Sequence, residues 1–406
     1  MNILYINHYA GSIYHGMEYR PYYLASEWVK QGHTVTIVAS SFSHLRTKNI
    51  TVSNDLNYLN EVIDGINYIW CKTKPYKQNG IKRLFNIFEF LLKVKRIIPD
   101  LMACKPDVVI ASSTYPFDTY LAKKISKKTK AKFIYEIHDL WPLTPIELGG
   151  MSKYHPFIWL MQRAENYGYK NADRVVSLLP CAKDYMVLHG MSEHKFLYIP
   201  NGVRVNDWLE NTELVPIDHQ QIINNAKSRF KLLIGYAGSM GDANALEYLV
   251  EASIFQKDVA FILVGDGLNK NILIDDVKIR NLDNVFILPS IKKSQIPNFL
   301  TQMDILYIGW HKLSIYRFGI CPNKIFDYML AKRPILHSVT AGNDLVIEAN
   351  CGISVAAEDV FSIVDAIDCF KNTTKEHLLQ YGQSGYNYVT KNHDYNNLAT
   401  KFLENI

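Results

Sequence analysis

The sequence lacks the features that mark secreted, metal-stapled or membrane-spanning proteins. Its six cysteines are scattered and form no CxxC pair, which is typical of reduced thiols and speaks against a disulfide framework or a zinc site. No apolar run reaches the ~18–20 residues of a spanning helix. The N-terminal MNILYINHYA has no basic stretch before its apolar residues, so we expect no signal peptide. These absences predict a cytoplasmic protein that could work only on the surface of a membrane.

A strong excess of charge is also missing. Forty-four Lys and Arg oppose 39 Asp and Glu, and the net charge of +5 is too small to indicate a nucleic-acid partner. The basic residues are nevertheless clustered. Residues 72–96 contain eight Lys or Arg and one acid, Glu89, and residues 123–132 contain six lysines and no acid. These clusters form either a merely solvated basic face or a surface that docks on anionic lipid.

The length and the alternation of apolar segments predict the fold class. A chain of 406 residues exceeds the usual limit of one hydrophobic core, so we expect two domains of about 200 residues each. The apolar content of 48% fits a well-buried globular protein. Strands alternate with helices in both halves, which predicts α/β architecture with two doubly wound parallel sheets.

The first half begins as strand, glycine-containing loop, helix and strand. The helix is expected at residues 21–31, ended by Gly32. Buried parallel strands are expected at residues 3–6, 34–39, 107–112, 133–137 and 174–178. The segment Ile81–Ile98 predicts a helix with a wide apolar face and basic ends, either a core helix or one that docks on anionic lipid. The polar stretch from YIPNGV (residues 198–203) to about Ser228 is interpreted as a linker.

In the second half, the stretch Cys321–Leu336, CPNKIFDYMLAKRPIL, is the most informative. Pro322 suits a helix start near Asn323, and the first turn of a helix offers N–H groups and a positive dipole end to a phosphate. Lys324 lies in that turn, and Asp327 follows on the same face, where it could accept a hydrogen bond from a sugar hydroxyl. The alternative is an ordinary amphipathic helix with a Lys–Asp salt bridge.

Six phrases taken in order resemble a known family. They are HGMEYRPYYLASEWVKQGHTVTIVAS, YEIHDLWPLTP, IPNGV, IGYAGSMGDANALEYLVEA, FILVGDG and PNKIFDYMLAKRPIL. Over about residues 1–400 the chain is similar to bacterial glycosyltransferases of family 4, which are GT-B-fold, retaining, metal-independent enzymes that use nucleotide sugars. The phrases are most similar to the subgroup that builds O-antigen or capsule repeat units, including enzymes described as L-fucosamine transferases.

The resemblance implies a division of labour between two Rossmann-like domains. Residues 1–205 would bind the acceptor, residues 206–385 the nucleotide sugar, and residues 386–406 would form a helix that returns to the first domain. The reaction would take place in the cleft and would need a UDP-sugar co-substrate but neither cofactor nor metal. The implied acceptor is a glycan or an undecaprenyl-diphosphate-linked sugar, and the implied location is cytoplasmic, with the inner face of the plasma membrane as a possible docking surface.

The resemblance also implies site residues. His138 in EIHDLWP matches the family's active-site histidine; the alternative is a loop histidine bonded to Asp139, which is itself more typical of a structural residue. The expected catalytic group is His138, Asp139 and Glu18. Expected acceptor contacts are Arg20, Tyr14 and His15, although a structural salt bridge is an equal alternative for Glu18 and Arg20. Expected donor contacts are Gly11, Gly238, Ser239, Gly241, Arg204, Ile291, Arg317, Phe318, Gly319, Lys324 and Asp327.

Three positions depart from the family pattern. Ser239 and Asn244 occupy the positions at which the family often has an Arg and a Lys that hold the diphosphate. Gly319 occupies the position of the first acid of the family's E-x7-E motif. Diphosphate binding would then depend on the backbone amides of residues 238–241, on Lys324, and on Arg317 or Arg204.

No pair of acids suited to double displacement stands out, so the expected chemistry is front-face transfer, in which fixed positive charge stabilises the leaving diphosphate. Two other functions stay open. One is a non-hydrolysing UDP-sugar 2-epimerase, and the other is a non-catalytic subunit of a polysaccharide assembly complex, which the three replacements would fit.

Overall fold

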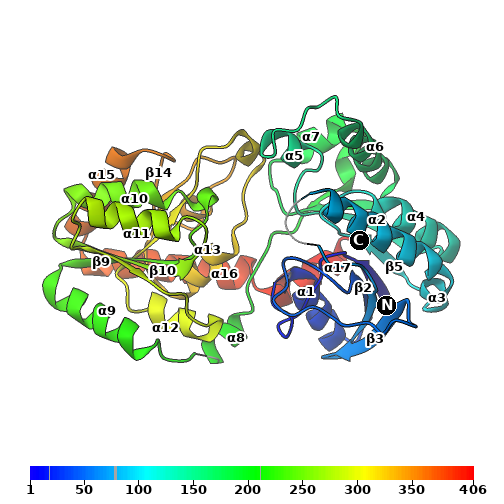
Figure 1. The fold of residues 1–406 in the computed structure, drawn as a ribbon, viewed down its shortest axis with the longest axis horizontal. Coiled ribbons are helices and arrows are strands. Elements are labelled where there is room, and N and C mark those ends of the chain that lie inside the picture. Colours follow the sequence, from blue (N-terminus) through cyan, green and yellow to red (C-terminus); the bar gives the residue numbers. More distant parts are fainter. Residues whose placement is uncertain (18, 77–79, 211) are drawn as a thin grey trace. The chain divides into compact units, whose positions relative to one another are not determined.

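The computed structural model describes residues 1–406 except 18, 77–79 and 211. The chain divides into two compact units, of which unit 1 is residues 1–201 with 395–406 and unit 2 is residues 202–394. The boundary expected after residue 385 falls inside a continuous helix, Lys375–Asn392, and the chain enters unit 1 again only at Tyr395. Each unit is an α/β layer structure built around its own sheet (Figure 1).

The described part of unit 1 contains an eight-stranded sheet in the order β3-β4-β2-β1-β5-β6-β7-β8. Its strands are β1 (Asn2–Ile6), β2 (Thr34–Ser40), β3 (Tyr58–Ile63), β4 (Ile66–Cys71), β5 (Val108–Ala111), β6 (Lys132–Ile137), β7 (Arg174–Ser177) and β8 (Phe196–Tyr198). Its helices are α1 (Tyr19–Lys30), α2 (Ile81–Arg96), α3 (Ile98–Ala103), α4 (Asp118–Thr129), α5 (Leu143–Glu147), α6 (Pro156–Asn171), α7 (Lys183–Leu188) and α17 (Tyr395–Glu404).

The strand order of unit 1 reverses at β1, which pairs in parallel with β2 on one side and β5 on the other. Ligands of open α/β sheets bind at the carboxyl ends of strands at such a point. Only β3 runs antiparallel within the described sheet; it joins β4 through Asp64 and Gly65, whose φ angles of 50° and 81° fit a two-residue hairpin turn. The sequence analysis did not predict this hairpin.

The last helix, α17, completes the core of unit 1. The Trp28 indole of α1 donates a hydrogen bond to the Ala399 carbonyl at 3.0 Å, and its ring lies edge-on to Phe402 at 5.2 Å. The two helices lie side by side over one face of the sheet (Figure 1). The C-terminal segment therefore folds as part of unit 1.

Unit 2 contains, among the described residues, a six-stranded parallel sheet in the order β11-β10-β9-β12-β13-β14. The strands are β9 (Leu232–Ser239), β10 (Val259–Asp266), β11 (Val285–Leu288), β12 (Ile305–Gly309), β13 (Ile335–Ser338) and β14 (Gly352–Val355). The helices are α8 (Val205–Glu210), α9 (Ile217–Arg229), α10 (Leu246–Ala252), α11 (Lys270–Ile279), α12 (Ile296–Leu300), α13 (Asn323–Leu330), α14 (Leu345–Glu348), α15 (Val360–Asn372) and α16 (Lys375–Asn392). One core lies under α9, α12 and α13, and the other under α10, α11 and α15 (Figure 1).

One expectation about local structure was wrong, and another was confirmed except at its end. The stretch interpreted as a linker contains α8 and α9, and α9 buries His219, Ile223 and Ala226 against the sheet because these residues share one helical face. The helix expected over Ile81–Ile98 ends at Arg96, and α3 begins at Ile98. Pro99 explains the break, since proline cannot continue the hydrogen-bond ladder of a preceding helix.

Candidate functional site

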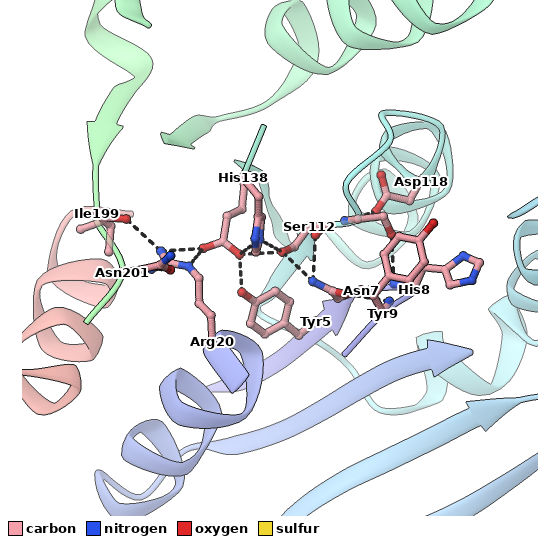
Figure 2. A network of polar contacts seen from close by, with 12 residues as sticks. Tyr5, Asn7, His8, Tyr9, Arg20, Ser112, Asp118, His138, Ile199 and Asn201 are labelled. Carbon is pink, nitrogen blue, oxygen red and sulfur yellow. Dashed lines mark hydrogen bonds and ion pairs between the residues drawn. The ribbon is translucent and has the colours of Figure 1, made fainter. Parts of the chain in front are cut away.

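A buried polar network lies at the carboxyl edge of the unit 1 sheet (Figure 2). Glu136, near the end of β6, accepts two hydrogen bonds from the Arg20 guanidinium of α1, at 3.1 and 2.9 Å. Its other carboxylate oxygen accepts hydrogen bonds from the Tyr5 hydroxyl and from the Ser112 hydroxyl, the latter at 2.6 Å. The Glu136 side chain is fully buried and Arg20 is nearly so.

The ion pair of Arg20 and Glu136 stays charged. Burial acts to raise the pKa of Glu136, but the Arg20 guanidinium and the hydrogen bonds from His138 and Ser112 outweigh it and lower that pKa well below its usual range. Burial likewise acts to lower the pKa of Arg20, and the Glu136 carboxylate reverses this. Arg20 also donates hydrogen bonds to the carbonyls of Ile199 at 2.9 Å and Pro200 at 2.5 Å. The pair therefore fixes the segment that leads out of unit 1.

His138 follows β6 directly and joins this network from its exposed side. Its Nε2 atom lies 2.9 Å from the Ser112 hydroxyl and 3.3 Å from the Glu136 carboxylate. About 17% of the imidazole remains exposed. The network holds one ring nitrogen and thereby orients the ring at the edge of the sheet, where open α/β sheets bind ligands.

The other expected residues of unit 1 lie in different environments. Arg20 is engaged in the buried ion pair, which is the structural alternative left open by the sequence. His15 is buried against the Ser12 hydroxyl at 2.8 Å, whereas Tyr14 and Asp139 are exposed. Glu18 lies outside the described residues. The geometry thus gives no support to acceptor contacts from Arg20 or His15.

Gly11 has a local structural role. A Cβ atom at this position would lie 2.6 Å from the Met17 carbonyl oxygen, so the loop itself occupies the space that a side chain would need. The glycine is explained by the packing of its own loop, and close approach of a donor phosphate stays a prediction.

A second cluster at the same edge was not predicted from the sequence. His8 is fully buried, with its ring nitrogens 2.6 Å from the Tyr115 hydroxyl and 2.8 Å from the Asn86 side-chain oxygen. Arg83 of α2 donates to the Tyr9 hydroxyl at 3.1 Å and packs over the Trp141 ring at 5.6 Å. These partners come from segments that are distant in sequence, and no local motif marks them.

In unit 2, Lys324 lies in the first turn of α13 and reaches toward the carboxyl end of β9. Its ammonium donates hydrogen bonds to the Tyr236 hydroxyl at 2.9 Å and to the Asn244 side-chain oxygen. It also lies 4.6 Å from the centre of the Tyr236 ring. Within the described residues Lys324 forms no salt bridge, so the alternative of a Lys324–Asp327 pair was wrong.

Burial shifts the pKa values of both charged residues on this face of α13. It lowers the pKa of the Lys324 ammonium to about 7 and raises the pKa of the Asp327 carboxyl to about 6. Both side chains remain partly exposed. A desolvated ammonium whose partners are neutral dipoles is a site that favours an anionic ligand.

The glycine turn after β9 is tightly packed beside Lys324. A Cβ atom on Gly238 would lie 3.3 Å from the Lys324 nitrogen, and one on Gly265 would clash with the Gly238 carbonyl at 1.9 Å. The Met240 amide donates to the Asp266 carbonyl at 2.8 Å. The Met240 amide is therefore already used within the fold, and Ser239 is exposed beside it.

Tyr236 was missed by the sequence analysis. Its hydroxyl donates a hydrogen bond to the Ser239 carbonyl at 2.5 Å while it accepts one from Lys324. It thereby connects the cation to the glycine turn. The available signal was an aromatic residue two positions before a glycine turn. An aromatic residue that is simply buried in a strand gives the same sequence pattern, so the signal did not distinguish Tyr236.

The remaining donor candidates occupy several parts of unit 2. Arg204 pairs with Asp207 at 3.3 Å, and Arg317 is exposed, donates to the Ser314 carbonyl at 2.6 Å and packs on the Phe318 ring. Gly319 has a φ of 98°, which explains glycine there. Ile291, which follows β11, packs against the core below α9. None of these observations assigns a ligand contact.

Two general properties complete the description. In the part of the chain that the structure describes, no group of three or more His, Cys, Asp or Glu is placed to hold a metal ion. Among those same residues, no helix combines the length and apolar character needed to cross a bilayer. None of the six cysteines forms a disulfide bond.

Comparison with known proteins identifies both halves of the chain. Residues 14–207 match the Glycosyltransferase Family 4 model, and residues 231–371 match the model of Glycosyl transferases group 1. The chain is a glycosyltransferase of the GT-B fold. The finer L-fucosamine transferase-like subgroup is not distinguished by these matches.

Individual relatives of this glycosyltransferase are distant. The probable glycosyltransferase WbjE of Pseudomonas aeruginosa is 22% identical over 304 residues, which are 71% of this chain and 71% of that protein. HepE from Anabaena, solved in complex with UDP, has a TM-score of 0.67 at 13% identity over 100% of this chain and 99% of that one. Sucrose-phosphate synthase from Thermosynechococcus elongatus has a TM-score of 0.70 at 15% identity, covering 99% and 97%. At these identities the structures establish the fold alone.

Proposed function

We propose that this glycosyltransferase is a retaining, metal-independent enzyme that transfers a sugar from a UDP-sugar to a lipid-linked or glycan acceptor during O-antigen or capsule synthesis. Unit 2 binds the donor and unit 1 the acceptor. The transferred sugar is a hexose of the N-acetylated or deoxy class. The enzyme is cytoplasmic and works at the inner face of the plasma membrane. The retaining course, the acceptor and the pathway derive from the resemblance of the sequence to family 4.

The observation that carries the donor site is the pair of Lys324 and Asp327 on one face of α13. The ammonium of Lys324 is desolvated without a counter-ion, which makes it a binding group for a diphosphate. The carboxylate of Asp327 makes no hydrogen bond within the described residues and is free to accept from the ribose hydroxyls. The helix start supplies backbone N–H groups beside them.

The structures of HepE support UDP as the nucleotide, because that protein was solved with UDP and with UDP-glucose. In the chain described here, Lys324 replaces the cations that the family pattern would place at Ser239 and Asn244. Asn244 holds the ammonium and Tyr236 couples it to the glycine turn. The departures at Ser239 and Asn244 are thus compatible with a working donor site.

The proposed chemistry depends on orientation and electrostatics. In front-face transfer the leaving diphosphate oxygen accepts the proton of the acceptor hydroxyl, while Lys324 stabilises the charge that develops on the diphosphate. His138 is proposed to orient the reacting sugar at the edge of the sheet, where Ser112 and Glu136 hold its Nε2 atom in place.

Calorimetry with a nucleotide series tests the donor site. UDP should bind roughly 10–100-fold more tightly than UMP, because the second phosphate adds a hydrogen bond to a charged group. Equal affinities would contradict the diphosphate role of Lys324. Turnover is then measured with a panel of UDP-sugars in the presence of a polyprenyl-diphosphate sugar acceptor. Conversion of UDP-N-acetylglucosamine to its 2-epimer without acceptor would overturn the transferase in favour of the epimerase.

A further inference from the structure

Three neighbouring helices of unit 1 share an outward face on which large apolar side chains lie beside basic ones. α2 contacts α4, and α4 contacts α6, as Figure 1 shows. On α2, Phe85, Phe88 and Leu92 are three and four residues apart and form one stripe, with Phe85 and Leu92 exposed by 68% and 56%. Exposed Lys82 and Lys95 extend the stripe at its two ends.

The stripes of the other two helices have the same character. On α4, residues three or four apart form a stripe of Tyr120, Lys124 and Lys127. On α6, the same spacing gives a stripe of Leu160, Arg163, Tyr167 and Lys170. Trp159, at the start of α6, is 59% exposed and lies under the Arg163 guanidinium at 5.7 Å. The acid beside the α2 stripe is Glu89, which is half-buried and accepts a hydrogen bond from the Lys74 amide at 2.8 Å.

A groove of about 690 Å³ joins the stripes into one surface. Its walls include Phe88 of α2, Phe117, which directly precedes α4, Tyr120 of α4 and Leu160 of α6. The exposed Arg163 and Lys170 also line it. Phe88 and Phe117 are 5.7 Å apart between ring centres. Phe88 of α2 and Leu160 of α6 therefore face the same groove.

The face is also polarised along the helices. α4 and α6 run from the carboxyl edge of the parallel sheet back to its amino edge, as helices between parallel strands do. On α4, Tyr120 lies in the first turn and Lys124 and Lys127 lie in later turns. On α6, Trp159 and Leu160 lie near the start and Lys170 at the end, with Arg163 and Tyr167 between them. The apolar end of the face is thus nearest the edge that carries His138.

We propose that the α2–α4–α6 face docks on the surface of an anionic phospholipid bilayer. Exposed aromatic and aliphatic side chains beside a groove enter the headgroup region, where tryptophan and tyrosine are favoured. Lysines and arginines on the same stripes bind the lipid phosphates, since each basic residue near an anionic leaflet adds attraction. The inference rests on the proposed function only in assuming a lipid-linked acceptor; its geometry is independent of donor binding.

Vesicle co-sedimentation tests the docking surface. The full chain should bind vesicles of phosphatidylglycerol mixed with phosphatidylcholine, should not bind phosphatidylcholine alone, and should dissociate as salt screens the charges. Phe85→Ser with Leu92→Ser, and separately Lys124→Glu with Lys127→Glu, should each weaken binding by about tenfold or more. The matched control is Ile272→Ser with Ile279→Ser on α11 of unit 2, whose side chains are 67% and 78% exposed.

Tryptophan fluorescence provides a second readout on the folded protein. Trp159 emission should shift to the blue on anionic vesicles, and this shift should disappear in Trp159→Phe. Vesicle binding that is equal in the wild type and both double variants would overturn the proposal. The proposal would also be overturned if the wild type did not bind vesicles and formed a dimer that the double variant Phe85→Ser with Leu92→Ser converted to a monomer. That result would indicate a self-association face. UDP affinity measured on each variant separates these outcomes from failure of the donor site.

Discussion

Each unit places a desolvated cation near the carboxyl edge of its sheet, and the two cations differ in their partners. In unit 1 the Arg20 guanidinium faces the Glu136 carboxylate at 2.9 Å and two backbone carbonyls. In unit 2 the Lys324 ammonium faces a tyrosine hydroxyl and an asparagine oxygen. The first charge is balanced within the fold, whereas the second is stabilised only by neutral dipoles.

The difference separates a structural charge from a ligand-binding one. A buried charge that is paired and fully hydrogen-bonded holds chain segments in place, and its removal leaves the partner charge uncompensated. A desolvated charge without a counter-ion is costly to the free protein, and this cost is relieved when an anion binds. The comparison thus supports a structural role for Arg20 in unit 1, and it agrees with the role in diphosphate binding that we propose for Lys324.

Removing the paired cation should have the largest effect on stability. Arg20→Met leaves Glu136 buried without its counter-charge, so the free energy of unfolding should fall by about 3–5 kcal/mol. Denaturant titration followed by circular dichroism measures this change. The control is Lys183→Met, which breaks the exposed pair with Glu193 and should change stability by less than about 1 kcal/mol. Equal effects of the two substitutions would show that Arg20 is not a structural charge.

The next largest effect should appear in the pH dependence of donor binding, because this binding depends on the charges of Lys324 and Asp327. The ammonium of Lys324, with a pKa of about 7 in the free protein, must be protonated to bind a diphosphate, so affinity should fall about tenfold per unit above pH 7. Asp327, with a pKa of about 6, must be ionised to accept from ribose, so affinity should also fall below pH 6.

Calorimetry with a UDP-sugar measures this profile, because its diphosphate has no ionisation in that range. The variant Lys324→Met should lose the alkaline limb and keep the acid one. An unchanged alkaline limb in this variant would assign it to another group.

The smallest expected effect concerns the ribose. Asp327→Asn keeps the shape of the side chain but replaces a charged acceptor by a neutral one, so UDP affinity should fall roughly fivefold to tenfold, as for one charge-assisted hydrogen bond. Affinity for inorganic diphosphate should not change, which distinguishes a ribose contact from general disturbance of α13. A loss of diphosphate affinity would contradict the assigned role of Asp327.

Local patterns in the sequence predicted the elements that form this architecture. The start of α13 after Pro322, the end of α1 at Gly32 with its positive φ, and most strands agree with the structure within one or two residues. Each of these depends on neighbours in the chain. The β3–β4 hairpin was missed although Asp64 and Gly65 carried its turn signal, and the polar composition around α9 concealed a helix with a narrow buried face.

The partners of charged residues could not be predicted in the same way. Arg20 lies near a glycine loop and resembled a ligand contact, but its partner Glu136 is 116 residues away. Lys324 and Asp327 have the spacing of a helical salt bridge, yet the ammonium turns to Tyr236, 88 residues distant. Such pairings are determined by the strand order of the sheets, which brings distant segments to one edge.

The thermal stability of Lys324→Met with and without UDP tests the central claim most directly. Without ligand, the variant should melt at the same temperature as the wild type or up to roughly 2–4 °C higher, because an uncompensated buried charge is removed. UDP should raise the melting temperature of the wild type and of the exposed control Lys292→Met, but not that of Lys324→Met. An equal rise in all three proteins would contradict the assignment of Lys324 as the diphosphate-binding cation.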